Sequence, residues 1–123
     1  MFMNNKIFLE SEELSFNREL AKIIGVEGAI VLKYIHNCVQ KNKKNGINYI
    51  EGKYWVVKSL KDWQNDVFNF WNQSTVKRTF SALEKKGVLV ACKLTKRDFD
   101  HTKWYTIDYD ELENIIFTVE NRI

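Results

Sequence analysis

The sequence predicts a mostly helical α+β domain, and three observations support this prediction. Apolar residues recur at helical spacing in several segments. Two apolar and aromatic runs that flank a polar loop have the pattern of a small antiparallel hairpin. A length of 123 residues, 45% of them apolar, suits one hydrophobic core. We therefore expect a single domain over residues 1–123.

The N-terminal part predicts an extended arm over residues 1–14, followed by two helices. Ser15 or Asn17 can cap a short first helix, which ends at Gly25. The second helix extends from Val26 to about Lys43, and its apolar side chains cover an arc of roughly 200°. An arc this wide indicates either a central helix covered on two sides or a helix that also contacts a second subunit.

The middle of the chain predicts one strand and a short helix. Aromatic and β-branched residues between Tyr49 and Val57 favour a strand, with a bend or bulge at residues 51–53. Ser59 then caps a helix from Leu60 to about Asp66.

The helix predicted from Gln73 to Lys86 has clear start and stop residues. Asn72 is a good N-cap, and Trp71 and Val76 occupy the two positions of a hydrophobic staple. Gly87 suits the position just after the last turn.

The two faces of this helix differ in chemistry. At about 100° per residue, Val76, Phe80 and Leu83 project onto one compact apolar stripe. The opposite face is basic and rich in hydroxyl groups, and it carries Ser74, Lys77, Arg78, Ser81 and Lys85.

A hairpin and a last helix complete the chain. Val88–Cys92 and Lys103–Ile107 flank a charged tip, and Asp108 caps a helix expected over residues 108–123. Residues 72–107 hold eight basic and three acidic side chains, whereas residues 108–123 hold five acidic and one basic. The basic charge is therefore concentrated on one contiguous segment.

This order of elements predicts a winged helix-turn-helix, whose chemistry suits double-stranded DNA. The basic helix can enter the major groove, where Gln73, Ser74 and Arg78 would meet base edges. Lysines and arginines on this helix and on the hairpin would contact phosphates. The predicted DNA-binding residues are Gln73, Ser74, Lys77, Arg78, Ser81, Lys85, Lys93, Lys96, Arg97 and Lys103.

Other site chemistries have little support in the sequence. His36 and Cys38 diverge by about 200° on one helix, so they cannot share a metal or act together as base and nucleophile. The sequence contains neither a CxxC pair nor a phosphate-binding P-loop motif. We therefore expect no catalytic site, no metal and no cofactor. With no apolar run long enough for a membrane span and no signal peptide, a cytoplasmic location is expected.

The segment from Asn72 to Leu89, NQSTVKRTFSALEKKGVL, resembles the recognition-helix segment of bacterial winged-helix proteins. A wider pattern over about residues 6–113 includes LAKIIG, YWV and KWYTIDY. It resembles the N-terminal winged-helix domain of replication proteins from phages and mobile elements of Gram-positive bacteria, relatives of DnaD-type replisome organisers. The resemblance implies a self-associating DNA-binding module that marks or opens an origin and recruits replisome proteins. Since such proteins usually continue into a further C-terminal region, this chain would be either one domain or a stand-alone relative.

Two other functions remain open from the residues themselves. The chain could be a winged-helix transcriptional regulator, or a winged helix that binds proteins and not DNA. A repressor needs strong base discrimination and usually an inducer pocket. The few candidate base readers, chiefly Gln73, Ser74 and Arg78, favour the replication role.

Overall fold

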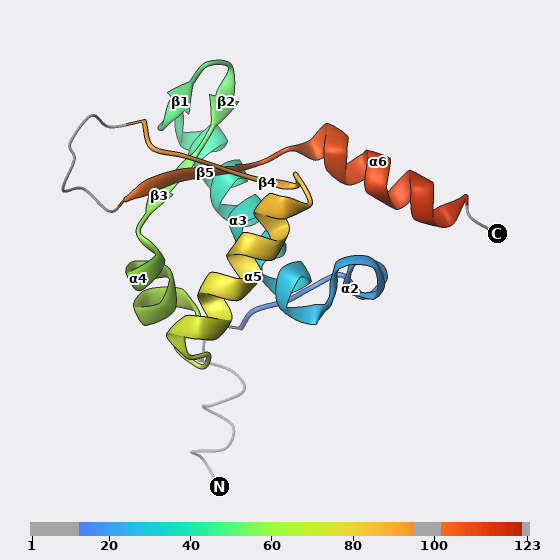
Figure 1. Ribbon diagram of the computed structural model, residues 1–123. Coiled ribbons are helices and arrows are strands. Elements are labelled where there is room, and N and C mark those ends of the chain that lie inside the picture. Colours follow the sequence, from blue (N-terminus) through green and yellow to red (C-terminus); the bar gives the residue numbers. More distant parts are fainter. Residues whose placement is uncertain (1–12, 95–101, 122–123) are drawn as a thin grey trace, which may run out of the picture.

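A computed structural model describes residues 13–94 and 102–121, and their buried side chains form one hydrophobic core. Helices make up most of the secondary structure, and two small antiparallel sheets complete it, so the predicted α+β class is confirmed (Figure 1). The elements in chain order are α2 (Arg18–Ile24), α3 (Val26–Asn45), β1 (Tyr49–Ile50), β2 (Lys53–Tyr54), β3 (Val56–Lys58), α4 (Leu60–Asp62), the π-helical turn η1 (Trp63–Val67), α5 (Gln73–Lys85), β4 (Leu89–Cys92), β5 (Lys103–Ile107) and α6 (Tyr109–Glu120).

Three helices begin at the capping residues that the sequence predicted. The side-chain oxygens of Asn17, Asn72 and Asp108 each accept a hydrogen bond from the backbone N–H three residues ahead, at 2.9, 2.8 and 3.0 Å. Such caps satisfy N–H groups that have no partner inside the helix. Gly25, between α2 and α3, has φ 89°, which accords with the predicted glycine break.

Helix α3 is the central helix, and its wide apolar arc is covered within the chain. Val31, Leu32 and Ile35 are buried in the core. The partly buried Ile30, Tyr34 and Cys38 continue the arc along one edge, and Tyr34 contacts the Trp63 and Phe68 rings edge-on at centroid distances of 6.0 and 5.9 Å. The arc therefore requires no second subunit to cover it.

The prediction of one strand from Tyr49 to Val57 was wrong. Strands β1 and β2 form a separate hairpin in which Tyr49 pairs with Tyr54. The turn residues Glu51 and Gly52 have φ values of 53° and 77°, as a two-residue type I′ turn requires. Strand β3 then joins the other sheet.

The third predicted helix, Leu60 to Asp66, is confirmed in position and in its cap, because Ser59 Oγ accepts from Asp62 N–H at 3.1 Å. Its form differs, since α4 gives way to a π turn at Trp63. The Phe68 N–H donates to the Trp63 carbonyl at 2.8 Å, a five-residue spacing. In an α-helix these side chains would be about 140° apart, whereas here both are buried and their rings stack at 6.0 Å. The extra residue in the turn thus directs both large rings into the core.

The larger sheet has the strand order β3-β5-β4, with both pairings antiparallel. The predicted hairpin is confirmed, with Leu89 opposite Ile107 and Cys92 opposite Trp104. Its strands begin at Leu89 and Lys103, and residues 95–101 of its tip lie outside the described part of the chain. The same is true of most of the predicted N-terminal arm.

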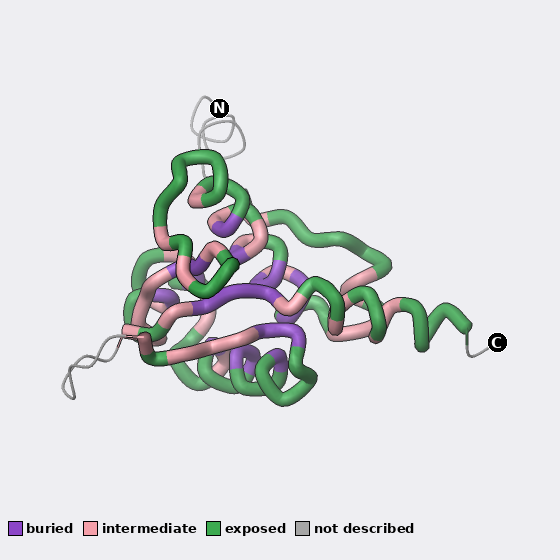
Figure 2. Tube along the Cα trace, turned by 90° about the horizontal axis from the view of Figure 1, so that it is seen from above, coloured by how far each residue is buried: buried purple, intermediate pink, exposed green. Residues whose placement is uncertain are grey.

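Burial follows the arrangement of the layers (Figure 2). The sheet strand β5 and the inner faces of α3 and α5 carry the buried residues, whereas α6 extends from the body with none of its residues fully buried. Helix α5 therefore has one face fixed on the core and one face open to solvent.

Candidate nucleic-acid interface

Helix α5 is capped at both ends by local hydrogen bonds. After the Asn72 cap, its C-terminal end is closed by Gly87, whose φ is 78°. Gly87 N–H donates to the Glu84 carbonyl at 3.0 Å, and Val88 N–H donates to the Leu83 carbonyl at 3.2 Å. This pair of bonds is a Schellman motif, which stops the helix one residue before the predicted Lys86.

The inner face of α5 packs closely against α3. Val76, Phe80 and Leu83 are each 1% exposed, as the apolar stripe predicted. A Cβ atom placed on Gly28 of α3 would lie 3.1 Å from Leu83 Cδ2, so the two helices approach as closely as a glycine allows. A larger residue at position 28 would therefore crowd the Leu83 side chain.

The outer face of α5 carries every DNA-binding residue predicted on this helix. All six are exposed, namely Gln73, Ser74, Lys77, Arg78, Ser81 and Lys85. Within the described part of the chain, neither lysine nor Arg78 takes part in an ion pair. Their charges are therefore available to an external anion.

Two further predicted residues lie where the strands of the hairpin open toward its tip. Lys93 follows β4 and Lys103 begins β5, and both are exposed. Lys96 and Arg97 fall in the tip, outside the described residues. The structure thus places two of the four predicted hairpin residues near each other.

Sequence reasoning missed Lys58, which the sheet brings to the same end. Lys58 on β3 is the register partner of Lys103 on β5. Its Nζ lies 3.4 Å from an Asp66 carboxylate oxygen and 5.7 Å from the centre of the Trp63 ring. Only the pairing of β3 with β5 shows that Lys58 joins Lys93 and Lys103 at this end of the sheet.

Acidic groups lie within and beside the basic face. Glu84 is exposed on α5 itself, seven residues after Lys77, and so lies on the same side of the helix. Glu27 of α3 lines a hollow of about 230 Å³ together with Arg78 and Lys86. One carboxylate therefore borders the positive face on the α3 side, and another interrupts it near the C-terminal end of α5.

The clearest pKa shift near α5 belongs to a buried tyrosine. Tyr105 of β5 is 1% exposed, and burial, followed by the negative charge of Glu84, raises the pKa of its hydroxyl to about 12. It remains neutral at physiological pH, so its role here is to support Phe80, whose ring it meets edge-on at 5.5 Å.

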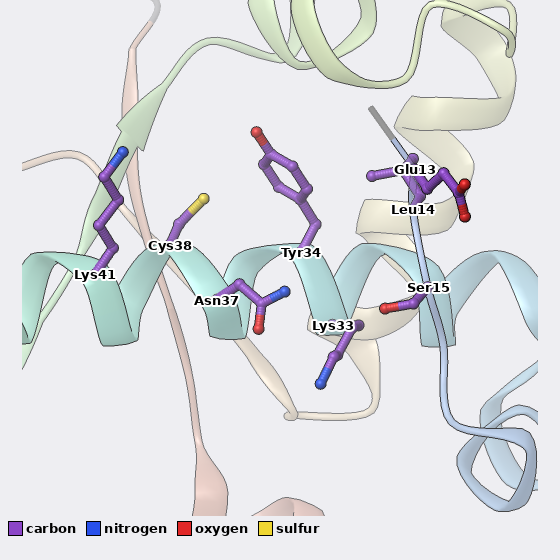
Figure 3. A pocket seen from close by; sticks show the side chains of 8 residues that line it. All are labelled: Glu13, Leu14, Ser15, Lys33, Tyr34, Asn37, Cys38 and Lys41. Carbon is purple, nitrogen blue, oxygen red and sulfur yellow. The ribbon is translucent and has the colours of Figure 1, made fainter. Parts of the chain in front are cut away.

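A hollow beside α3 is the alternative place for a site (Figure 3). It measures about 260 Å³ and is lined by eight residues of α3 and of the segment before α2. Tyr34, Cys38 and Lys41 rise on one side of α3, whereas Lys33 points away from them. These side chains do not converge on one point, as acid–base or nucleophilic catalysis requires.

The described residues contain neither a candidate metal site nor a candidate membrane-spanning helix. Among residues 13–94 and 102–121, no three His, Cys, Asp or Glu side chains cluster in a way that could hold a metal ion. None of the helices in this part of the chain combines the length and apolar character needed to cross a membrane.

No protein-family model matches the chain, and comparisons with curated proteins and with solved structures gave no significant match.

Proposed function

We propose that this chain binds double-stranded DNA as a winged helix-turn-helix, with α5 as the recognition helix and the β4–β5 hairpin as the wing. The observation that carries the proposal is the solvent-exposed basic face of α5, opposite a face anchored in the core. The strand order β3-β5-β4 supports it, because β4 follows α5 directly at the sheet edge, as the wing of a winged helix does, and lysines of the hairpin would then add to the binding surface.

The chemistry of this face fits the outside of a duplex better than a small ligand. Its cations are spread along α5 and the end of the hairpin next to its tip, and no enclosed cavity among the described residues gathers them. Lysines spaced in this way neutralise successive phosphates, while Gln73, Ser74 and Arg78 at the start of the helix are long or polar enough to reach base edges.

We further propose that the DNA-binding activity serves replication initiation and involves self-association and contacts with replisome proteins. The support is the resemblance of residues 6–113 to the N-terminal domains of phage and mobile-element replication proteins. A transcriptional regulator is the second candidate, and it is favoured only by the general suitability of the winged helix for operators.

The DNA-binding proposal is tested by removing two charges from α5. Lys77→Ala with Arg78→Ala is expected to weaken binding of a fluorescent duplex at least tenfold, since each base or phosphate contact is worth about 1–3 kcal/mol. The matched control is Lys33→Ala with Lys41→Ala on α3, which removes the same charge from another surface. Equal affinities for the two variants, both folded by circular dichroism, would contradict the proposal.

Replication and regulation are separated by the specificity ratio. We expect origin-derived duplex to be preferred over random duplex at the low end of the roughly 10³ to 10⁷ range of dedicated DNA-binding proteins. A single operator bound much more tightly, and released by a small molecule, would favour the regulator. Absence of binding to any duplex would favour a protein-interaction module.

A further inference from the structure

The β1–β2 hairpin presents an aromatic pair to solvent at the end of the molecule away from α4 and the start of α5 (Figure 1). Tyr49 and Tyr54 are direct cross-strand partners, and their ring centres are 4.7 Å apart. Tyr49 is 57% exposed, more than most large hydrophobic side chains of this protein. An aromatic ring so exposed has no part in the core.

The hairpin is a rigid support for this ring. Trp55, which is 3% exposed, anchors its base: the indole Nε1 donates to the Ile50 carbonyl at 3.0 Å, and the backbone N–H donates to the Asn48 carbonyl at 3.0 Å. Asn42 of α3 donates to the Trp55 carbonyl at 2.7 Å. A bond from the other sheet adds to them, because the Thr106 hydroxyl of β5 donates to the Tyr54 carbonyl at 2.8 Å. Together with the tight turn at Glu51 and Gly52, these bonds fix the backbone that carries Tyr49.

Positive charge accompanies the tyrosines. Residues 41–54 hold four lysines and one acidic residue, Glu51. Lys43 and Lys53 line the same groove as Tyr54, which measures about 440 Å³. All four lysines, Lys41, Lys43, Lys44 and Lys53, are exposed, and within the described ranges none of them forms an ion pair.

The far wall of this groove is acidic, and it limits where an anion can lie. Asp108 and Asp110, at the start of α6, line it opposite the lysines. The Asp108 carboxylate is occupied as the cap of α6, where it accepts from Glu111 N–H at 3.0 Å. A polyanion would therefore follow the end of α3 and the hairpin, and not the side next to α6.

We propose that the β1–β2 hairpin is a second nucleic-acid surface, which binds single-stranded DNA by stacking an unpaired base on Tyr49 while Lys43, Lys44 and Lys53 contact the backbone. An exposed, preorganised ring, with lysines on the same hairpin and on the adjoining end of α3, is the chemistry that single strands need. Every base offers a π face, whereas duplex bases are already stacked. This surface is separate from α5, so the inference goes beyond the proposed duplex-binding function and does not depend on it.

The test measures binding of a short fluorescent oligothymidylate to the full chain by anisotropy at low salt. Tyr49→Phe should bind like the unmodified protein. Tyr49→Ala should bind about tenfold more weakly, because it loses the binding free energy of one base stacked on an aromatic ring. Because Tyr49→Ala could disturb the hairpin, Tyr49→Leu provides a variant that keeps apolar contact with Tyr54 but lacks a π face. It should bind as weakly as Tyr49→Ala. Phe117→Ala on α6, which removes another exposed aromatic ring, is the matched control and should have no effect.

Further variants separate the two surfaces. Lys77→Ala with Arg78→Ala should leave oligothymidylate binding unchanged, and Tyr49→Ala should leave duplex binding unchanged. Failure of the unmodified protein to bind oligothymidylate would overturn the inference while leaving duplex binding by α5 untouched. Equal binding by the Tyr49→Leu and Tyr49→Phe variants would also overturn it, as would a loss of oligothymidylate binding in the α5 variant alone.

Discussion

At the residue scale, Asn72 determines where α5 begins. Its side chain accepts from Thr75 N–H at 2.8 Å, so Asn72→Ala removes one cap and should lower the free energy of unfolding by about 1 kcal/mol. Urea denaturation followed by circular dichroism measures the change. Asn69→Ala, an exposed position in the preceding turn, serves as the control and should stay within about 0.5 kcal/mol of the unmodified protein. A result for Asn72→Ala no larger than that of the control would show that the cap contributes nothing.

Tyr105 predicts a loss of stability at alkaline pH. Burial raises the pKa of its hydroxyl from 10.0 to about 12, so the folded state retains a proton that the unfolded state has lost between these values. The stabilisation is fully present below pH 10 and disappears as the pH rises through 12, at up to about 1.4 kcal/mol per pH unit.

The Tyr105 prediction is checked by urea denaturation at pH 9, 10 and 11. Tyr105→Phe keeps the buried ring that packs on Phe80 and removes the titrating group. The stability of the unmodified protein should therefore fall more steeply with pH than that of Tyr105→Phe. Parallel curves for the two proteins would assign the alkaline loss to other groups.

At the scale of elements, the β4–β5 hairpin should contribute electrostatically to duplex binding. Lys93 and Lys103 flank its tip, where they would meet phosphates and not base edges. Lys93→Ala with Lys103→Ala should weaken binding to all duplex sequences by a similar factor. The slope of log affinity against log salt should become shallower by about one unit for each lysine that no longer neutralises a phosphate.

The hairpin prediction is measured by anisotropy titrations over a series of salt concentrations. The pair Lys33→Ala with Lys41→Ala again controls for the change in net charge. A slope that is unchanged from the unmodified protein would place the hairpin outside the interface.

At the scale of the whole molecule, we expect the proposed self-association to use α6 and not α3. Phe117 is 65% exposed, and α6 has no buried residue although it is 12 residues long. A groove of about 400 Å³ between α2 and α6 is lined mainly by apolar side chains: Leu20, Ile23, Ile116 and Val119. Apolar surface of this kind is buried at interfaces between subunits.

We therefore expect a concentration-dependent dimer in analytical ultracentrifugation. Ile116→Ser with Val119→Ser should shift the equilibrium toward monomer, because it makes one wall of the groove polar. Tyr49→Ser, which changes an exposed apolar side chain at the other end of the molecule, should not. A monomeric mass at every concentration of the unmodified protein would reject this expectation.

Local chemistry in the sequence determined most of α5 and its surroundings. The Asn72 cap, the Gly87 stop and the apolar stripe of Val76, Phe80 and Leu83 depend on neighbours within a few residues, so periodicity and capping preferences identify them. The same holds for the β4–β5 hairpin, whose two apolar runs lie close in the chain. The exposed face of α5 follows from its buried one, which is why its six candidate residues could be named from the sequence.

What only the tertiary structure decided depends on contacts between distant residues. The pairing of β3 with β5 brings Lys58 beside Lys103, and the packing of Trp63 and Phe68 in one core changes an expected α-helix into a π turn. Helix α3 could be assigned to the interior only once the rings that cover Tyr34 were known. Residues 49–57 were expected to form one strand because aromatic and β-branched residues lie on both sides of residues 51–53. The reversal there depends on the positive φ of Glu51 and Gly52 and on the burial of Trp55 in the core. Sequence periodicity reports which face of an element is apolar, whereas the partner of that face is a property of the folded chain.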